Sequence, residues 1–260
     1  MGKIVAIANQ KGGVGKTTTA VNLAAALGAL GKKILLVDID PQGNATSGYG
    51  VNRRAMAGSA YDLFTGQKSF DEVMVNTLFT NVNLVPSHID LAGAEIELVS
   101  MDRREYRLRD ALITPKQSFD YILLDCPPSL GLLTLNGLNA ADTILIPIQC
   151  EYYALEGLSQ LMSTVRQVKR LYNPHLEIEG VLITMYDSRV NLTVQVVEEV
   201  KKFFPQKVYS VAIPRNVRVS EAPSYGKPIK YYDAGSKGSE AYDTLALEFL
   251  ENNRQWGEMK

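Results

Sequence analysis

A glycine-rich turn near the start of the chain constrains the fold more than any other stretch. The apolar run at residues 4–8 is typical of a buried parallel strand, and the Ala- and Leu-rich segment at residues 16–30 is typical of a helix. The turn between them brings Gly15, Lys16 and Thr17 to the start of this helix. A strand, a glycine-rich turn and a helix in this order indicate a binding site for phosphate groups.

Each residue type in the turn has a chemical use. Glycine has no Cβ, so backbone N–H groups can approach phosphate oxygens closely. Lys16 can reach the outer phosphates, the Thr17 hydroxyl can ligate Mg²⁺, and the helix N-terminus favours an anion. We therefore predict a site for a nucleoside triphosphate with Mg²⁺. The residues predicted to bind it are Lys11, Gly12, Gly13, Val14, Gly15, Lys16, Thr17 and Thr18.

The turn departs from the common P-loop pattern at one position and adds a lysine. The pattern G-x-x-x-x-G-K-[ST] requires glycine at position 10, where this chain has Gln10. Residues 11–17, KGGVGKT, instead form the deviant Walker A motif, in which Lys11 is a second lysine. On this motif the chain resembles the ParA/MinD group of P-loop ATPases. The resemblance implies ATP and Mg²⁺ as cofactors, a nucleotide-dependent homodimer, and catalytic roles for Lys16 and for Lys11, which reaches the partner's nucleotide.

Two aspartates follow the next apolar strand, residues 34–37. Asp38 and Asp40 stand where the carboxyl end of a parallel strand faces a ligand crevice. Considered alone, the segment fits an Asx turn containing Pro41 equally well. In the resembled group this segment is switch I. The resemblance implies that Asp40 is catalytic and positions the water that attacks the γ-phosphate, with Asp38 near the magnesium ion.

A third signal lies at residues 121–128. Four apolar residues lead into Asp125, as in a Walker B strand, and Asp125 is predicted to hold Mg²⁺ through water. The prolines at 127 and 128 force a turn into a segment that resembles switch II. Cys126 is expected to be a small buried residue rather than a nucleophile.

Strands and helices are predicted to alternate along the chain. Further strands are expected at residues 83–87 and 143–147, and further helices at 91–99, 104–112, from about 149 to 171, after Asp187 and at 239–253. Such alternation favours an α/β fold with a doubly wound, mostly parallel sheet and helices on both faces. We expect residues 1–260 to form one ATPase domain, with 254–260 as a tail. Residues 45–81 are the least informative and are expected to supply packing and dimer contacts.

Composition excludes some functional classes. The net charge is −1 and the pI about 6.2, so any binding of nucleic acid requires a local basic patch. The longest apolar runs have strand length, which predicts no membrane span. The two cysteines, Cys126 and Cys150, are too few for a disulfide framework or a Cys-x-x-Cys metal site. We therefore expect a cytoplasmic protein.

Residues 201–230 supply the local basic patch. Seven basic residues there oppose only Glu221, which gives +6 in a chain of net charge −1. Any single lysine is more often a solvated surface residue than a ligand contact. Arg189 and Arg218 match positions that the resembled proteins use to contact the backbone of double-stranded DNA without sequence preference. The DNA-binding candidates are Arg189, Lys201, Lys202 and Arg218.

The resemblance is close to the chromosomal Soj/ParA type at three further segments, residues 149–157, 178–185 and 213–218. It implies that Met185, Pro214 and Asn216 contact the adenine base. Glu151 has two equal interpretations. It either reaches the partner's nucleotide or is an acidic residue favoured by a helix N-terminus.

For this family the resemblance implies association with the nucleoid and a ParB/Spo0J-type centromere-binding partner that stimulates slow ATP hydrolysis and releases the DNA-bound dimer. A MinD-like membrane-associated ATPase shares every nucleotide residue and is the main alternative. Its basic amphipathic C-terminal helix is not matched here, because the C-terminal segment carries Glu248, Glu251 and Glu258. We therefore predict no membrane partner. A biosynthetic ligase gives no reason for Lys11 with the basic patch, and an iron–sulfur carrier requires paired cysteines at a dimer face.

Overall fold

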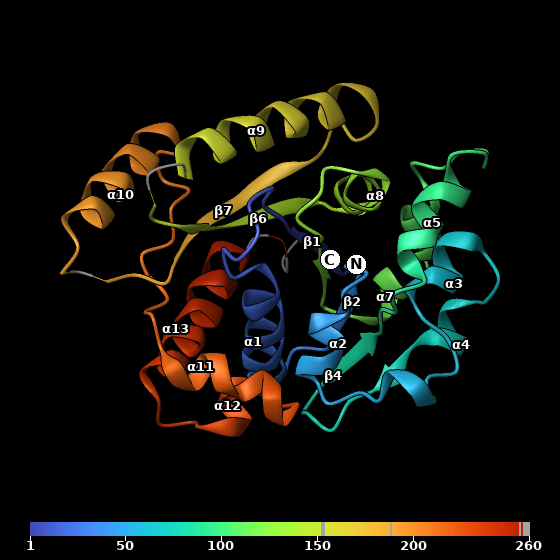
Figure 1. Ribbon diagram of the computed structural model, residues 1–260, viewed down its shortest axis with the longest axis horizontal. Coiled ribbons are helices and arrows are strands. Elements are labelled where there is room, and N and C mark those ends of the chain that lie inside the picture. Colours follow the sequence, from blue (N-terminus) through green and yellow to red (C-terminus); the bar gives the residue numbers. More distant parts are fainter. Residues whose placement is uncertain (152–153, 188, 255, 257–260) are drawn as a thin grey trace.

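The computed structural model describes residues 1–151, 154–187, 189–254 and 256, and Figure 1 shows a central sheet flanked by helices. The strands are β1 (Lys3–Ile7), β2 (Ile34–Asp38), β3 (Val75–Asn76), β4 (Val82–Val85), β5 (Tyr121–Asp125), β6 (Thr143–Gln149) and β7 (Glu177–Thr184). The α-helices are α1 (Lys16–Ala29), α2 (Asn44–Gly48), α3 (Ala60–Thr65), α4 (Phe70–Val73), α5 (Leu91–Leu98), α6 (Arg107–Ala111), α7 (Pro115–Ser118), α8 (Leu132–Ala140), α9 (Ala154–Leu171), α10 (Asn191–Phe203), α11 (Val217–Glu221), α12 (Ile229–Tyr232) and α13 (Lys237–Asn252). Two 3₁₀ helices are η1 (Arg53–Ala55) and η2 (Ala222–Tyr225).

The sheet is doubly wound, as predicted. Within the described residues its strand order is β3-β4-β2-β5-β1-β6-β7, and each neighbouring pair is parallel except β3 with β4. The register aligns Asp125 with Ile7 on one side and with Asp38 on the other. Because parallel strands end at the same edge, the phosphate loop, switch I and the Walker B aspartate meet there.

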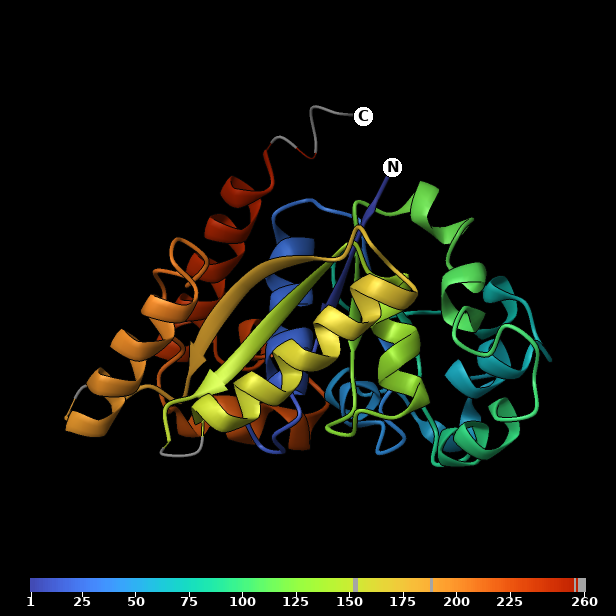
Figure 2. The same ribbon diagram turned by 90° about the horizontal axis from the view of Figure 1, so that it is seen from above.

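Alternate residues of the central strands pack into two separate cores. Val5 and Ile7 face the core formed with α1 and α13, whereas Ile4 and Ala6 face the core formed with α5, α8, α9 and α10. A period of two is what a strand covered on both faces requires. Figures 1 and 2 show α1 and α13 side by side against one face, and α9 crossing β6 and β7 on the other. The predicted fold class is therefore confirmed.

Three predicted helices differ from the structure in their extent. The helix expected from about residue 149 is α9, which begins at Ala154, because Gln149 is still the last residue of β6. The helix expected at 104–112 is only α6, because turns occupy residues 101–105 and Tyr106 precedes the helix as its N-cap. The helix expected to open at Asp187 begins at Asn191, with Val190 as its N-cap in an extended conformation. Of the predicted residues, Ser188 and most of the tail at 254–260 lie outside the described part of the chain.

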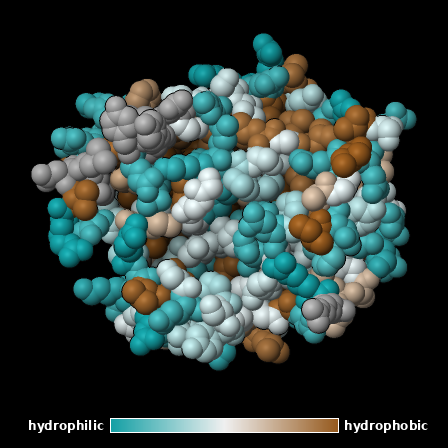
Figure 3. Space-filling view, in the orientation of Figure 1, coloured by the Kyte–Doolittle hydropathy of each residue, from teal (hydrophilic) through white to brown (hydrophobic). Residues whose placement is uncertain are grey.

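No helix within the described residues is long and apolar enough to cross a bilayer. The face seen in Figure 3 is mostly hydrophilic, with apolar side chains gathered at the upper right, over the area that Figure 1 labels α5 and α8. Ile96 and Val99, in and just after α5, are among the large apolar side chains that remain exposed.

Candidate functional site

The phosphate loop joins β1 to α1 in the conformation that its glycines require. Gly13 and Gly15 have φ values of 74° and 86°, in the left-handed region that side chains disfavour. The loop is fixed by Asn9, whose side chain accepts the Lys11 N–H at 3.0 Å and donates to the Pro147 carbonyl at 2.7 Å. Sequence reasoning missed Asn9, because its partner at the end of β6 is 138 residues away.

Lys16 is buried at the start of α1. Its Nζ donates to the Lys11 carbonyl at 3.0 Å across the mouth of the loop. Burial lowers the pKa of this ammonium group, an effect that the nearby carboxylate of Asp125 opposes. The side chain therefore lies within the loop that is predicted to surround the phosphates.

One cavity brings the phosphate loop and switch I together. Its volume is about 280 Å³, and both Lys16 and Asp40 line it. The other lining residues are Gly12, Gly13, Gly15, Thr17, Thr18, Gln42, Asn44, Pro128 and Met185. The sequence had predicted these segments separately, and the fold places them around one space.

Asp125 fits a magnesium ion held through water. It is fully buried, and neither carboxylate oxygen has a hydrogen-bond partner within 3.5 Å among the described residues, although the nearby Thr17 side chain acts to lower its pKa. Burial raises the pKa of this carboxyl well above its usual value, and the neighbouring Asp38 raises it further. A buried carboxylate with no donor within 3.5 Å is stabilised by a cation, and the Thr17 side chain lies near it, so the donor set of Asp125 and Thr17 fits hydrated Mg²⁺.

Asp38 has a different environment from that of Asp125. Its Oδ2 accepts the N–H and the hydroxyl of Thr46 at 2.8 and 2.7 Å, and its Oδ1 accepts the Asp40 N–H at 3.2 Å. Burial raises the pKa of Asp38 to about 6, although the hydrogen bonds from Thr46 oppose this shift. Both oxygens of Asp38 are thus used within switch I and the following helix.

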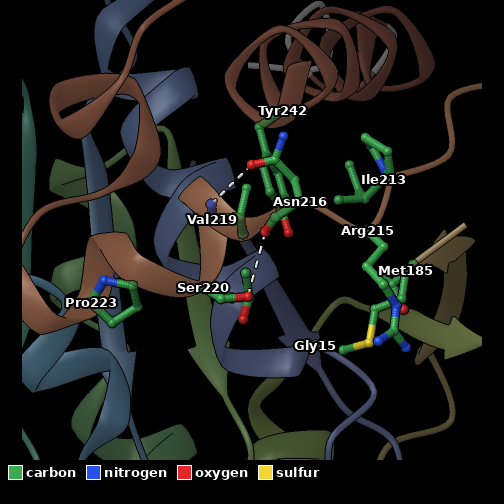
Figure 4. Close-up of a pocket in the computed structure, with 12 residues that line it drawn as sticks. Gly15, Met185, Ile213, Arg215, Asn216, Val219, Ser220, Pro223 and Tyr242 are labelled. Carbon is green, nitrogen blue, oxygen red and sulfur yellow. Dashed lines mark hydrogen bonds between the residues drawn. The ribbon is translucent and has the colours of Figure 1, made fainter. Parts of the chain in front are cut away.

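A second cavity, of about 230 Å³, adjoins the first and contains the predicted base contacts (Figure 4). The two cavities share Gly15, Thr18 and Met185. Met185 has a φ of 51°, which is unusual for a residue with a side chain and turns the chain at the end of β7. The remaining lining residues are Thr184, Ile213, Pro214, Arg215, Asn216, Val219, Ser220, Pro223 and Tyr242.

Two side chains fix the walls of this second cavity. The Thr184 hydroxyl donates to the Val14 carbonyl at 2.8 Å, which joins β7 to the phosphate loop. Asn216 caps α11, because its side-chain oxygen accepts the Val219 N–H at 3.2 Å (Figure 4). The resemblance had placed Thr184 in a segment that flanks the adenine, without a contact of its own, and sequence reasoning missed Tyr242 as a site residue. The pattern around Tyr242 indicated only a buried helix face.

The predicted DNA-binding residues lie in two places. Backbone hydrogen bonds join Tyr186 to Ile213 and Arg215, which links the loop of Arg189 to the segment leading to Arg218. Lys201 and Lys202 belong to the last turn of α10, about 15 Å along the helix from its start. These hydrogen bonds connect the segments that lead to Arg189 and to Arg218, whereas Lys201 and Lys202 lie at the far end of α10.

Three of these four candidates form ion pairs with nearby carboxylates. Arg189 contacts both oxygens of Asp187 at 2.9 and 2.7 Å. Arg218 contacts Glu221 at 3.0 Å and Asp233 at 3.5 Å, and Lys202 contacts Glu199 at 2.6 Å. The sequence count of seven basic residues against one acidic residue thus missed the acidic neighbours that the fold supplies from outside residues 201–230.

Comparison with known proteins identifies the family of this chain. A protein-family model described as "AAA domain" matches residues 2–178. The sporulation initiation inhibitor protein Soj of Bacillus subtilis is 58% identical over 252 residues, which are 97% of this chain and 100% of Soj. The chromosome partitioning protein ParA of Myxococcus xanthus is 54% identical over 253 residues, 97% of this chain and 89% of that protein.

Solved structures share the fold along the whole chain. Cobyrinic acid a,c-diamide synthase of Mycobacterium smegmatis, with bound ADP and magnesium, has a TM-score of 0.86 and 38% identity, covering 100% of this chain and 97% of that one. The septum site-determining protein MinD of Pyrococcus horikoshii, complexed with Mg-ADP, has a TM-score of 0.82 and 25% identity, covering 100% and 99%. From its identity to Soj and ParA over nearly its full length, this chain belongs to the Soj/ParA family of chromosome-partitioning ATPases.

Proposed function

We propose that this chain binds Mg·ATP, dimerises over the nucleotide, binds double-stranded DNA without sequence preference and then hydrolyses ATP slowly. The observation that supports this most is the cavity lined by both Lys16 and Asp40. It combines a phosphate-binding loop with a carboxylate that can hold water, which is what hydrolysis of a phosphoanhydride requires. The cofactors are ATP and Mg²⁺, in agreement with the ADP and magnesium in the similar solved structures.

The residues of this chain have separate parts in hydrolysis. The loop N–H groups and Lys16 bind the phosphates and neutralise their charge, and Asp40 orients the attacking water and accepts its hydrogen bond. Thr17 and, through water, Asp125 hold Mg²⁺, which when bound neutralises charge that develops on the phosphate oxygens. Lys11 serves the nucleotide of the second chain. Met185, Pro214 and Asn216 contact the base.

DNA binding follows from dimerisation in this proposal. Arg189 and Arg218 contact phosphates of the duplex, which needs positive charge but no base-reading pattern. A dimer presents both arginines twice and so increases the affinity and its dependence on salt. When the charge of the transition state is not fully stabilised, the hydrolysis rate is on the order of 10⁻⁴ to 10⁻² per second. A ParB/Spo0J-type partner on the nucleoid accelerates it and releases the dimer.

Fluorescence anisotropy of the Asp40→Ala protein with random duplex DNA tests the proposal. In ATP we expect binding that falls steeply with salt, and in ADP no binding. The same variant with Lys16→Ala added should bind DNA in neither nucleotide, because it holds no phosphate. Absence of DNA binding in ATP, with dimers present, would contradict the DNA-binding part and leave the nucleotide part standing.

Two other functions have a specific observation behind them. The likeness to MinD favours a membrane-associated ATPase, but Tyr242, Leu245 and Phe249 of α13 are buried in the core and Glu248 accepts N–H groups of residues 210 and 211. The 38% identity to a protein named as a diamide synthase favours an ATP-dependent ligase. Flotation of the protein with liposomes would indicate the membrane-associated ATPase. ATP turnover that depends on an added carboxylic acid and ammonia would indicate the ligase.

A further inference from the structure

Buried polar groups form a closed ring around switch I, residues 38–44. At one side of the ring, Asp38 accepts two hydrogen bonds from Thr46, at 2.8 and 2.7 Å, and one from the Asp40 N–H at 3.2 Å. Asp38 and Thr46 are fully buried. The carboxylate therefore ties the start of switch I to the helix that follows it.

Ser87 closes the ring from a distant part of the sequence. It follows β4, which pairs with β2, and it is fully buried. Its N–H donates to the Thr46 hydroxyl oxygen at 2.8 Å, and its own hydroxyl donates to the Asp40 carbonyl at 2.7 Å. The Thr46 hydroxyl thus both donates to Asp38 and accepts from Ser87.

The ring holds Asp40 at both of its backbone groups. The Asp40 N–H donates to the Asp38 carboxylate. The Asp40 carbonyl accepts the Ser87 hydroxyl and also the Gly43 N–H, the latter at 2.8 Å. Its carboxylate accepts the Gln42 N–H at 2.9 Å. Hydrogen bonds between buried groups are costly to break, because the freed groups find no water. The ring therefore determines where the Asp40 carboxylate stands in the cavity.

We propose that Ser87 and Thr46 are positioning residues that set the Asp40 carboxylate for hydrolysis. The proposal rests on the function proposed above for Asp40. Neither Ser87 nor Thr46 is among the described residues that line the phosphate cavity, so both act through Asp40 and not on the nucleotide. Their removal affects the rate of the chemical step and leaves the binding of ATP intact.

Single-turnover hydrolysis and ATP affinity, measured separately, test this role. Ser87→Ala removes the hydrogen bond to the Asp40 carbonyl, and Thr46→Val removes both the bond to Asp38 and the acceptor for the Ser87 N–H. Each variant should lower the hydrolysis rate by about tenfold or more, since small misplacements of a reacting group cost up to about a hundredfold. The dissociation constant for a fluorescent ATP analogue should change by less than about twofold. Thr46→Ser keeps the hydroxyl and should restore most of the rate.

Thr143→Val is the matched control. Thr143 is also buried, and its hydroxyl donates to Glu179 at 2.7 Å, away from the nucleotide. This variant should lose thermal stability but keep its hydrolysis rate. A thermal unfolding midpoint for each variant reports whether a lost rate reflects a lost fold.

Three results would overturn the proposal. They are a full rate in Ser87→Ala, a parallel loss of ATP affinity, and an equal loss of rate in Thr143→Val. The premise is tested on its own by Asp40→Ala. If that variant hydrolyses ATP as fast as the unchanged protein, the function of Asp40 fails; if it is inactive while Ser87→Ala is fully active, only the positioning role fails.

Discussion

The ammonium group of Lys11 contacts the carboxylate of Glu151 within the same chain. The two side chains are 32% and 47% exposed, so water screens the pair, and such pairs contribute about 0–1 kcal/mol. The lysine that is proposed to serve the partner's nucleotide is therefore occupied in the single chain by a contact that is easily exchanged. Glu151 thus contacts the phosphate loop of its own chain. Neither of the two sequence interpretations of Glu151 predicted this contact.

The first prediction concerns this pair. Glu151→Gln removes the competing charge and leaves Lys11 free for the second chain. We expect the ATP-bound dimer, in an Asp40→Ala background, to form at up to about fivefold lower protein concentration, the equivalent of about 1 kcal/mol. Analytical ultracentrifugation across a concentration series measures this.

Asp110→Asn is its control, because it removes the same charge from an exposed pair with Arg103 at 3.0 Å, away from the nucleotide. It should leave dimerisation unchanged. A weaker dimer in Glu151→Gln would instead indicate that Glu151 itself reaches across the interface.

The second prediction compares two glycines of the phosphate loop. A Cβ built on Gly12 meets nothing within 4 Å, and the φ of Gly12 is not in the left-handed region, whereas Gly15 has a φ of 86°. Gly12→Val should therefore leave the thermal stability of the single chain unchanged and prevent the ATP-bound dimer from closing. Gly15→Ala should destabilise the chain itself by about 1 kcal/mol.

Thermal unfolding without nucleotide and light scattering with ATP separate these effects. Within the single chain the structure has open space beside Gly12. Crowding then comes only from the nucleotide or the second chain. A Gly12→Val chain that is unstable without nucleotide would contradict this account.

The third prediction concerns a buried ion pair at the opposite end of β1 from the phosphate loop. Lys3 contacts Glu179 at 2.6 Å and also Asn253, and all three side chains are buried. Lys3→Met leaves the Glu179 charge without its partner and should lower the free energy of unfolding by about 3–5 kcal/mol. Adding Glu179→Gln to Lys3→Met should restore part of the lost free energy of unfolding.

Urea unfolding measures both changes. Lys68→Met is the exposed counterpart, since Lys68 lies 3.7 Å from Asp62 at the surface, and it should cost less than about 1 kcal/mol. An equal effect of the two lysine variants would show that Lys3 does not stabilise the fold through its charge.

Local patterns were sufficient for much of this fold. The strand before Gly15 and the helix after it were predicted because a continuous apolar run and a segment rich in Ala and Leu depend on a few neighbouring residues. The same patterns gave no sign of β3, a strand of two residues at the sheet edge, or of where α6 begins. Such short elements are determined by what they pack against.

The site was predictable where one short motif carries it. Lys16, Thr17 and Asp125 stand in motifs, and the fold brings their segments together. Ser87 and Asn9 could not be found in this way, because each acts through a hydrogen bond to a residue far away in sequence. The functions of the lining residues remain predictions.

The last prediction concerns the DNA surface. The Arg189 side chain is 86% exposed and donates to both oxygens of Asp187, at 2.9 and 2.7 Å, which lowers the pKa of that carboxyl to about 2. The Asp187 carboxylate therefore competes with a DNA phosphate for the arginine. In the ATP-bound Asp40→Ala background, Asp187→Asn should therefore strengthen DNA binding by a few fold at low salt, and the gain should shrink as salt rises.

Two variants complete this experiment. Arg189→Glu should abolish DNA binding and leave ATP-driven dimerisation intact. Glu177→Gln has the same net charge as Asp187→Asn but breaks an exposed pair with Lys169, outside the predicted DNA surface, so it separates a local effect from that of total charge.

Asp187 also accepts the Arg189 N–H at 3.1 Å, which orders the loop. If Asp187→Asn weakens DNA binding while Glu177→Gln does not, this ordering outweighs the competition, and Asp187 supports the arginine instead of opposing it.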